Sequence, residues 1–332
     1  MIKKEEYILV TGGAGYIGSV VVENLIAKGY NVIVIDDLRD GQRNAVPSDV
    51  IFFEDDCGDE NSLEEIFHNY KVSIVMHFAA SANVPLSIKY PQEFYHNNVV
   101  VSLVLLKMMV KFNIRKIIFS STAAVYGEPI YTPINEEHPL KPINPYGKSK
   151  LMVERILADY ANAYNIKYIA LRYFCAAGAS KINGETRKSQ ETHLIPLIID
   201  KIISPHKDLF IFGNDYVTRD GSGVRDFVHV NDIASAHIKG LNSIFKYPNS
   251  VYNLGTNKGY SVLEVIKMAE LIYNTTIDFK FSAKRPGDPA NLTSSYDKIK
   301  NELGWKPKFS LEDMLVSTMD WRKKIKKNKV VI

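Results

Sequence analysis

The sequence has few cysteines and no long apolar run, and both shortages narrow what the chain can be. Cys57 and Cys175 are the two cysteines among 332 residues, which allows neither a disulfide framework nor a metal-binding spacing. No apolar stretch approaches the roughly 20 residues of a membrane-spanning helix. The basic first residues lead into Glu5 and Glu6 rather than into the apolar core of a secretory signal. We therefore expect a protein of the reducing cytoplasm with no membrane partner.

Excess positive charge is confined to the C-terminus. The net charge is +4, but six basic side chains fall in the last residues, so the remainder of the chain has a net charge of −2. No stretch interleaves basic and aromatic residues as a surface for single-stranded nucleic acid does. We expect no nucleic-acid partner and predict a solvated, frayed tail, with attachment to an anionic membrane as the alternative. The six residues are Arg322, Lys323, Lys324, Lys326, Lys327 and Lys329.

What the chain does contain begins with a glycine-rich loop. Gly12, Gly15 and Gly18 follow the apolar run 7–10 and open a helical stretch over 16–28. This context is typical of a dinucleotide-binding turn, where the backbone approaches a pyrophosphate at the helix N-terminus.

An acidic pair follows the second apolar run. Residues 32–35 end in Asp36 and Asp37, and a carboxylate at this point binds the adenosine ribose hydroxyls and repels a 2′-phosphate. The predicted cofactor is therefore NAD rather than NADP.

Apolar strands alternate with helical stretches in the first half of the chain, which predicts an α/β fold with a Rossmann-type, doubly wound parallel sheet. Beyond about residue 175 the elements become shorter and richer in glycine and proline. We predict an NAD-binding domain over 1–175 and a smaller α/β substrate domain over 176–332, with packing of part of 225–255 on the first domain left open.

Ligands of such sheets bind beyond the carboxyl ends of the strands. The residues that follow expected strands, and so share this edge, are Gly12, Asp36, Asp56, Phe78, Thr122 and Tyr173.

A threonine, a tyrosine and a lysine supply the candidate chemistry. Tyr146 and Lys150 lie four residues apart, on one face of an expected helix. A tyrosine is a poor base at its ordinary pKa near ~10, but a neighbouring positive charge favours the phenolate. Thr122 can hydrogen-bond a substrate oxygen and relay its proton. In the second half, Arg225 and Arg285 lie in turn-rich stretches and could hold a diphosphate.

These motifs together resemble the extended short-chain dehydrogenases/reductases, and most closely the UDP-glucose 4-epimerase family. The likeness runs through nearly the whole chain, over 11–19, 77–80, 120–127, 145–151, 172–174, 212–216, 223–230 and 285–288. It implies an isomerase that inverts C4 of a UDP-hexose. Tyr146 would take the proton of the 4-hydroxyl while hydride passes to tightly held NAD, and the 4-keto sugar would turn and take the hydride back. Thr122 would hydrogen-bond the 4-oxygen, and Lys150 would hold the nicotinamide ribose.

The resemblance also implies binding residues for both ligands. Those for the cofactor are Gly12, Gly15, Tyr16, Ile17, Gly18, Asp36, Asp37, Leu38, Asp56, Cys57, Phe78, Ala79, Ala80, Asn97, Tyr146, Lys150 and Phe174. Those for the UDP-sugar are Thr122, Tyr146, Cys175, His193, Leu194, Phe210, Phe212, Arg225, Phe227, Arg285, Asp288 and Leu292.

Three positions depart from the family pattern. Ala82 stands where many members have a lysine at the cofactor, and Cys175 stands where an asparagine commonly meets the diphosphate. Leu292 falls at the position that closes the sugar pocket, where a bulky tyrosine restricts members to glucose and galactose and a small residue admits N-acetylated sugars. Leu292 is intermediate in size, so acetylated substrates remain open.

The sequence also bears on other functions of this fold. A dehydratase needs an Asp-Glu pair after the threonine, and a decarboxylase commonly has a glutamate nearby, whereas this chain has Ala123 and Ala124. Epimerases of UDP-pentoses or UDP-uronates remain open, as does an inactive NAD-binding regulator, although such a regulator would have little reason to keep Thr122, Tyr146 and Lys150. The family likeness also suggests a homodimer, for which 99–110 and 151–163 offer apolar faces.

Overall fold

A seven-stranded parallel sheet forms the larger part of the molecule. The computed structural model describes residues 5–186 and 191–330. The strand order is β10-β6-β5-β4-β1-β2-β3, with every neighbouring pair parallel, which confirms the predicted doubly wound fold. The strands are β1 (Tyr7–Thr11), β2 (Asn31–Ile35), β3 (Ile51–Phe53), β4 (Val72–His77), β5 (Lys116–Thr122), β6 (Lys167–Tyr173) and β10 (Ser250–Leu254).

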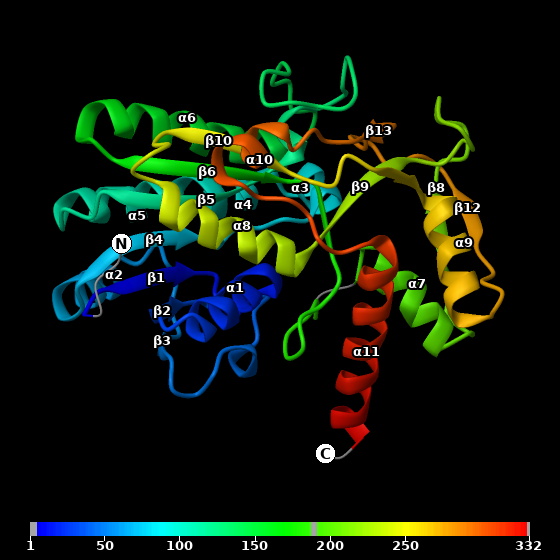
Figure 1. Ribbon diagram of the computed structural model, residues 1–332, viewed down its shortest axis with the longest axis horizontal. Helices are drawn as coiled ribbons and strands as arrows, with labels where there is room; N and C mark the ends of the chain where they lie inside the picture. Colours follow the sequence, from blue (N-terminus) through cyan, green and yellow to red (C-terminus); the bar gives the residue numbers. More distant parts are fainter. Residues whose placement is uncertain (1–4, 187–190, 331–332) are drawn as a thin grey trace.

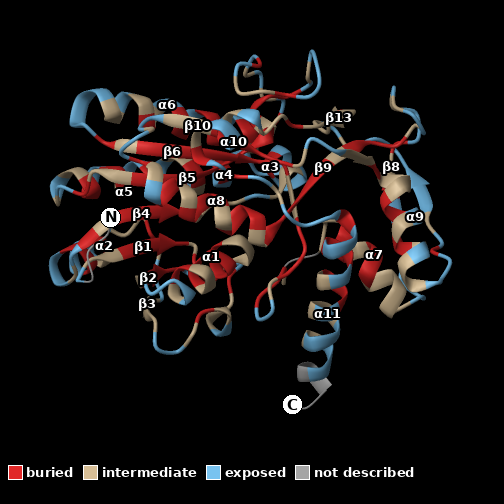
Figure 2. Cartoon of the chain, viewed as in Figure 1, coloured by how far each residue is buried: buried red, intermediate tan, exposed pale blue. Residues whose placement is uncertain are grey.

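Both faces of this sheet are covered, because alternate side chains of each strand point to opposite sides. Ile8 and Val10 pack towards α1 and α8, which cross the front of the sheet in Figure 1, whereas Leu9 packs towards the helices behind it. The front helices are α1 (Tyr16–Ala27), α8 (Val230–Ser243) and α10 (Asp297–Leu303), and those behind are α2 (Glu60–Asn69), α5 (Val101–Lys111) and α6 (Pro145–Tyr164). Figure 2 shows the strands buried between these two layers.

Short elements complete the first half of the chain. A π-helical turn interrupts the long helical stretch ahead of α5. These elements are α3 (Val84–Lys89), α4 (Pro91–Tyr95), the π-helix η2 (His96–Val100) and the 3-10 turns η1 (Arg43–Ala45) and η3 (Ala123–Val125).

The second half builds a smaller α/β unit with its own apolar core. Its sheets are a four-stranded one of β7 (Cys175–Ala177), β9 (Val224–His229), β11 (Gly259–Ser261) and β13 (Asn291–Leu292), and a two-stranded one of β8 (Phe210–Phe212) and β12 (Lys280–Ser282). Its helices are α7 (Leu194–Ile203), α9 (Val262–Tyr273) and α11 (Leu311–Val330).

The chain returns from the second half to the large sheet. β10 pairs in parallel with β6, and α8 packs against α1. Trp305 is fully buried in the same core, where its indole N–H donates to the carbonyl oxygen of Asp232 over 3.0 Å. The division of the chain at residue 175 remains a prediction, because the large sheet draws strands from both sides of it.

The C-terminal tail differs from the expected solvated, frayed segment. It continues α11 as far as Val330, and Arg322 is largely buried in ion pairs with Glu191 and Asp200. The Arg322 charge, which the sequence pattern assigned to solvent, is therefore paired with the largely buried carboxylate of Glu191. The lysines at 323, 324, 326 and 327 are exposed as expected, whereas the Lys329 side chain lies outside the described part of the chain. No helix within the described residues is both long and apolar enough to cross a membrane.

A buried ion pair fastens α6 to the sheet. The Arg172 guanidinium, on β6, donates to both carboxylate oxygens of Glu154, on α6, over 2.6 and 3.0 Å, and both side chains are almost completely buried. Ser121 donates to the same carboxylate, and Arg172 also donates to the Tyr126 hydroxyl over 2.8 Å. Tyr126 in turn donates to the Asn253 side chain over 2.6 Å, which extends the network to β10.

We expect Glu154→Gln to lower the free energy of unfolding by about 3 kcal/mol, because it leaves the buried Arg172 charge without its counterion. Urea denaturation measures this change. The exposed Glu60–Lys107 pair, with its atoms 2.6 Å apart, supplies the matched control, since Glu60→Gln should cost less than about 1 kcal/mol. Equal costs for the two substitutions would show that the buried network does not hold α6.

Candidate active site

The glycine loop brings backbone atoms into very close contact at the mouth of the large sheet. A Cβ on Gly12 would lie 2.5 Å from the Ala79 nitrogen, and one on Gly18 would lie 2.1 Å from the Gly12 oxygen. Gly12 also has a φ of 69°, which favours glycine. The first turn of α1 therefore starts directly behind the loop, at the sheet edge.

A pocket opens in front of this turn. Residues from the ends of β1, β2 and β4, and from the segments that follow β2 and β3, line it: Gly12, Gly15, Ile35, Asp36, Asp37, Arg39, Asp40, Gly41, Asp56, Cys57, Phe78, Ala79, Ala80, Ser81, Asn97 and Val101. Most of the residues predicted to bind the cofactor are among them. A pocket with a helix N-terminus, glycine backbone and carboxylates fits a dinucleotide.

Asp36 is held in place within this pocket. Its carboxylate accepts hydrogen bonds from the backbone N–H groups of Ala14 and Leu38, each over 2.9 Å. Leu38 has a φ of 55°, in the left-handed region, so its backbone turns to complete that contact. Asp36 is thus fixed at the position from which a carboxylate reaches the ribose hydroxyls.

The other predicted cofactor residues lie outside the pocket lining. Tyr16 donates its hydroxyl to the Gly178 oxygen over 2.6 Å, which joins α1 to the segment after β7. Ile17 packs against the core in front of the sheet, and Phe174 packs in a small cluster near Leu151.

The candidate catalytic residues meet where β5 ends and α6 begins. Thr122 is the last residue of β5, and Tyr146 is the second residue of α6. A Cβ on Gly147 would lie only 2.4 Å from the Ala124 oxygen. This contact presses the first turn of α6 against the turn that follows Thr122. Thr122 accepts a hydrogen bond from the Ala124 N–H over 3.1 Å.

Lys150 lies one helical turn after Tyr146 and is buried. Its ammonium donates to the carbonyl oxygen of Ser120 over 2.9 Å and lies 4.8 Å from the centre of the Phe119 ring. Burial lowers the pKa of Lys150 to about 7, although the Glu154 carboxylate opposes this shift.

The second half presents arginines and a carboxylate beside this edge. Arg225, on β9, forms an ion pair with Asp288, and the Arg285 guanidinium lies 3.8 Å from the centre of the Phe212 ring. The Asn144 side chain, which caps α6, donates to the Gly287 oxygen over 3.3 Å. The helix that carries Tyr146 and the loop that carries Asp288 are therefore in contact.

The remaining predicted substrate residues lie in three places. Cys175 pairs with Phe227 across β7 and β9, and Leu292 pairs with Arg225 across β13 and β9, so these lie close to the ion pair. Phe210 is 43% exposed, with the Lys280 ammonium 5.9 Å from its ring centre. The group of His193 and Leu194 lies at the start of α7, where the His193 ring contacts Glu185 over 2.7 Å.

Known proteins share the sequence pattern of this chain. Residues 8–255 match the model of the NAD-dependent epimerase/dehydratase family. The chain belongs to this family. A UDP-glucose 4-epimerase of Halalkalibacterium halodurans is 44% identical over 320 residues, which are 95% of each chain.

Solved structures agree with this assignment. The Bifidobacterium longum UDP-glucose 4-epimerase, crystallised with NAD⁺ and UDP, is 39% identical with a TM-score of 0.92, over 96% of this chain and 98% of that one. The UDP-Glc/GlcNAc 4-epimerase of Campylobacter jejuni is 38% identical with a TM-score of 0.83, over 96% and 99% of the two chains. The predicted family and the predicted cofactor, NAD, are confirmed, whereas the role of each site residue remains a prediction.

The sequence did not predict some residues that lie at or beside the site of this epimerase/dehydratase family member. Gly41 lines the cofactor pocket, and a Cβ there would lie 2.6 Å from an Asp36 oxygen. His237 lies on α8, far along the chain, yet its ring packs 4.7 Å from that of Phe78. His237 donates from Nδ1 to the Ile233 oxygen, so its Nε2 accepts the Tyr173 hydroxyl over 2.8 Å. Nothing in the helical pattern around His237 marks it as part of the site.

We expect Gly147→Ala to reduce turnover at least tenfold, because the added Cβ must push the first turn of α6 away from Ala124. Gly240→Ala is the matched control, since Gly240 is also a buried helical glycine, but its nearest neighbour would lie 3.5 Å away. There the alanine should leave turnover intact and stabilise α8 by up to about 1 kcal/mol. Steady-state kinetics and thermal unfolding of both variants test this. Full activity of Gly147→Ala would mean that this contact does not position Tyr146.

Proposed function

We propose that this chain interconverts UDP-glucose and UDP-galactose by inverting C4 through a 4-keto intermediate. The observation that carries the proposal is the junction of β5 and α6, where a buried lysine, a tyrosine and a threonine meet with two alanines in place of further acids. The full-length similarity to UDP-glucose 4-epimerases supports the same activity.

The residues at this junction have distinct parts in the reaction. Bound NAD supplies the hydride acceptor and donor for C4. Tyr146 removes the proton of the 4-hydroxyl and later returns it, while Thr122 hydrogen-bonds the same oxygen. Lys150 lies one helical turn from Tyr146, where it holds the nicotinamide ribose and its positive charge favours the phenolate. Ala123 and Ala124 can neither remove the C5 proton nor protonate a leaving group, so the ketone is reduced again rather than dehydrated.

The nucleotide is held from the second half of the chain. Arg225 and Arg285 bind the diphosphate, since guanidinium groups match its paired oxygens. Asp288 binds the uridine ribose, and Phe212 lies along the uracil. The contact from Asn144 to Gly287 fixes this anchoring side relative to Tyr146. The sugar is thereby presented to the base at a set distance from the anchored diphosphate.

Sugar specificity depends on Leu292 in this proposal. Leu292 is partly buried and packs against a cluster that contains Tyr126 and Phe174. Glucose and galactose are the proposed sugars, and N-acetylated sugars are the second candidate because the leucine is smaller than a tyrosine. Relative kcat/KM for UDP-galactose and its N-acetylated counterpart distinguishes the two.

We expect Tyr146→Phe to lower kcat for UDP-galactose by at least about 100-fold, the scale of one lost general base. Bound NAD should remain, because the phenol is one of many cofactor contacts. A coupled assay of UDP-glucose formation, together with the absorbance of released nucleotide, measures both. A variant that turns over as fast as the wild type would contradict the role of Tyr146. Wild-type protein that keeps full activity after complete removal of NAD would contradict the mechanism.

We also propose a homodimer, located in the cytoplasm. Apolar side chains stand exposed on the outer layer, where Val100 is 47%, Leu103 37% and Met152 42% exposed, and burying such area stabilises association. Both cysteines are free, in keeping with a reducing compartment. Light scattering should give twice the 37.5 kDa chain mass, and Leu103→Glu should shift it to the monomer. A wild-type monomer at micromolar concentration would contradict this interface.

A further inference from the structure

The Tyr216 hydroxyl is buried and has no hydrogen-bond partner within the described residues. Two arginine nitrogens share this condition, but Arg115 and Arg322 each donate from another nitrogen. A tyrosine has one polar atom, so nothing else on Tyr216 compensates. Buried tyrosine hydroxyls usually find a partner, and an exception at the mouth of a binding site points to a ligand.

The ring of Tyr216 is held firmly, so the hydroxyl has a defined position. Its edge lies against Gly213, where an added Cβ would be 2.4 Å from a ring carbon. The Lys284 ammonium lies 4.7 Å from the ring centre and donates to the Asp215 oxygen over 3.0 Å. The ring is thus packed between a backbone turn and a side chain that is itself anchored.

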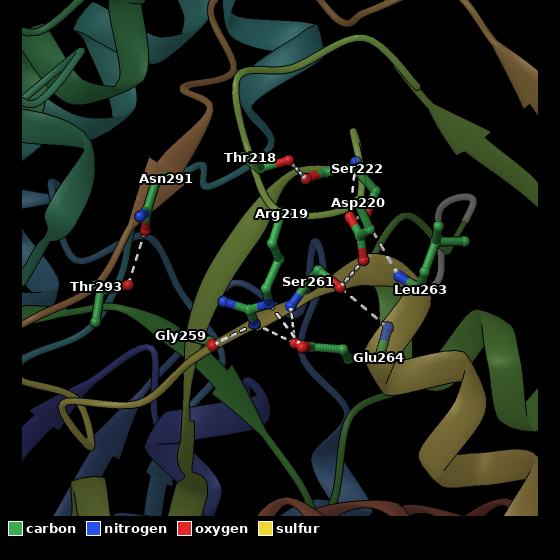
Figure 3. A network of polar contacts seen from close by, with 10 residues as sticks. All are labelled: Thr218, Arg219, Asp220, Ser222, Gly259, Ser261, Leu263, Glu264, Asn291 and Thr293. Carbon is green, nitrogen blue, oxygen red and sulfur yellow. Dashed lines mark hydrogen bonds and ion pairs between the residues drawn. The ribbon is translucent and has the colours of Figure 1, made fainter.

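The loop that carries Tyr216 is pinned to the start of α9. Arg219 forms an ion pair with Glu264 and donates to the Gly259 oxygen, and Asp220 accepts hydrogen bonds from Ser222 and Ser261 (Figure 3). Thr218 donates its hydroxyl to the Ser222 oxygen over 2.7 Å, as the same view shows.

Backbone hydrogen bonds hold Tyr216 itself within this loop. Its N–H donates to the Gly221 oxygen over 2.9 Å, and its own oxygen accepts from the Thr218 N–H over 2.8 Å. These bonds fix the backbone from which the phenol projects.

The hydroxyl lies among the charged groups of the diphosphate site. Burial raises the pKa of Tyr216, the negative charges of Asp288 and Asp215 raise it further, and Arg225 and Arg285 oppose the rise. Tyr216 is therefore a hydrogen-bond donor at neutral pH, beside the two arginines proposed to bind phosphate. An anionic oxygen is the strongest acceptor that such a donor can meet.

We propose that the Tyr216 hydroxyl donates a hydrogen bond to a phosphate oxygen of the bound nucleotide, as a further substrate-binding residue. The inference rests on the proposed function, because it needs a nucleoside diphosphate between Arg225 and Arg285. Arg225 donates to Asp288 in the structure. A bound diphosphate competes with Asp288 for the Arg225 guanidinium. The phosphate oxygens that bind Arg225 are then also accessible to the Tyr216 hydroxyl.

The position of Cys175 makes this donor important. Cys175 lies close enough to Arg225 for the arginine charge to act on its pKa, and burial raises that pKa to about 11. The thiol is therefore neutral and a weak donor. Tyr216 supplies a strong donor that Cys175 does not.

The test is Tyr216→Phe, which removes only the hydroxyl. Calorimetric titration of the holoenzyme with UDP should show a Kd raised about 5- to 10-fold, the value of one such hydrogen bond. KM for UDP-galactose should rise similarly with kcat nearly unchanged. Thermal stability without UDP should be equal or higher, because the variant removes an unsatisfied buried group.

Tyr273→Phe is the matched control. Tyr273 lies in the same half of the chain, and its hydroxyl has a partner, the Leu315 oxygen at 3.2 Å. That variant should lose stability and keep its affinity for UDP, which is the reverse of the pattern for Tyr216→Phe.

Two outcomes overturn the inference, and they are distinguishable from failure of the proposed function. If the wild type binds UDP and Tyr216→Phe binds it equally well, the hydroxyl does not contact the nucleotide. If Tyr216→Phe is less stable with unchanged affinity, the hydroxyl has a structural role instead. If the wild type itself does not bind UDP, the proposed function fails and the inference fails with it.

Discussion

The buried ion pair between Glu154 and Arg172 is the constraint on which the geometry of the site depends. Both partners lie near the site: Glu154 lies one helical turn after Lys150, and Arg172 precedes Tyr173 at the carboxyl end of β6. Burying two charges is costly unless their remaining hydrogen-bonding capacity is used, and here Ser121 and Tyr126 use it. Helix α6, strands β5 and β6 and the returning strand β10 therefore share one network next to the proposed catalytic residues.

The second half of the chain depends on the same edge for its orientation. β13 pairs with β9, which carries Arg225, and Leu292 of β13 packs into the cluster that follows Thr122. Together with the cap of α6, these contacts make the nucleotide anchor and the reacting centre parts of one rigid arrangement. A sugar linked to an anchored diphosphate has few positions available, yet C4 must present both faces in turn. In the proposed function the nucleotide is thus the fixed part of the substrate, and the freedom lies in the sugar at its end.

The sequence predicted the fold correctly, because the fold depends on local patterns. Strand, glycine turn and helix are adjacent in the chain, and parallel strands end at a common edge. What it missed depends on long-range contacts. Glu154 and His237 lie on helices whose polar positions ordinarily face solvent, and Arg322 resembled part of a basic tail. Only the packing of distant segments shows that all three are buried. No sequence pattern indicates that the Tyr216 hydroxyl has no hydrogen-bond partner within the described residues.

The return of β10 to the large sheet has a consequence for biosynthesis. β6 ends at Tyr173, and β10, its neighbour in the sheet, begins at Ser250. One edge of β6 is therefore unpaired in the nascent chain while the intervening residues are made. At ordinary rates of translation that interval lasts about 4 to 16 s. An open parallel edge of apolar strands is a template for wrong pairing. Only when translation has passed Leu254 can β10 pair with β6 and cover this edge.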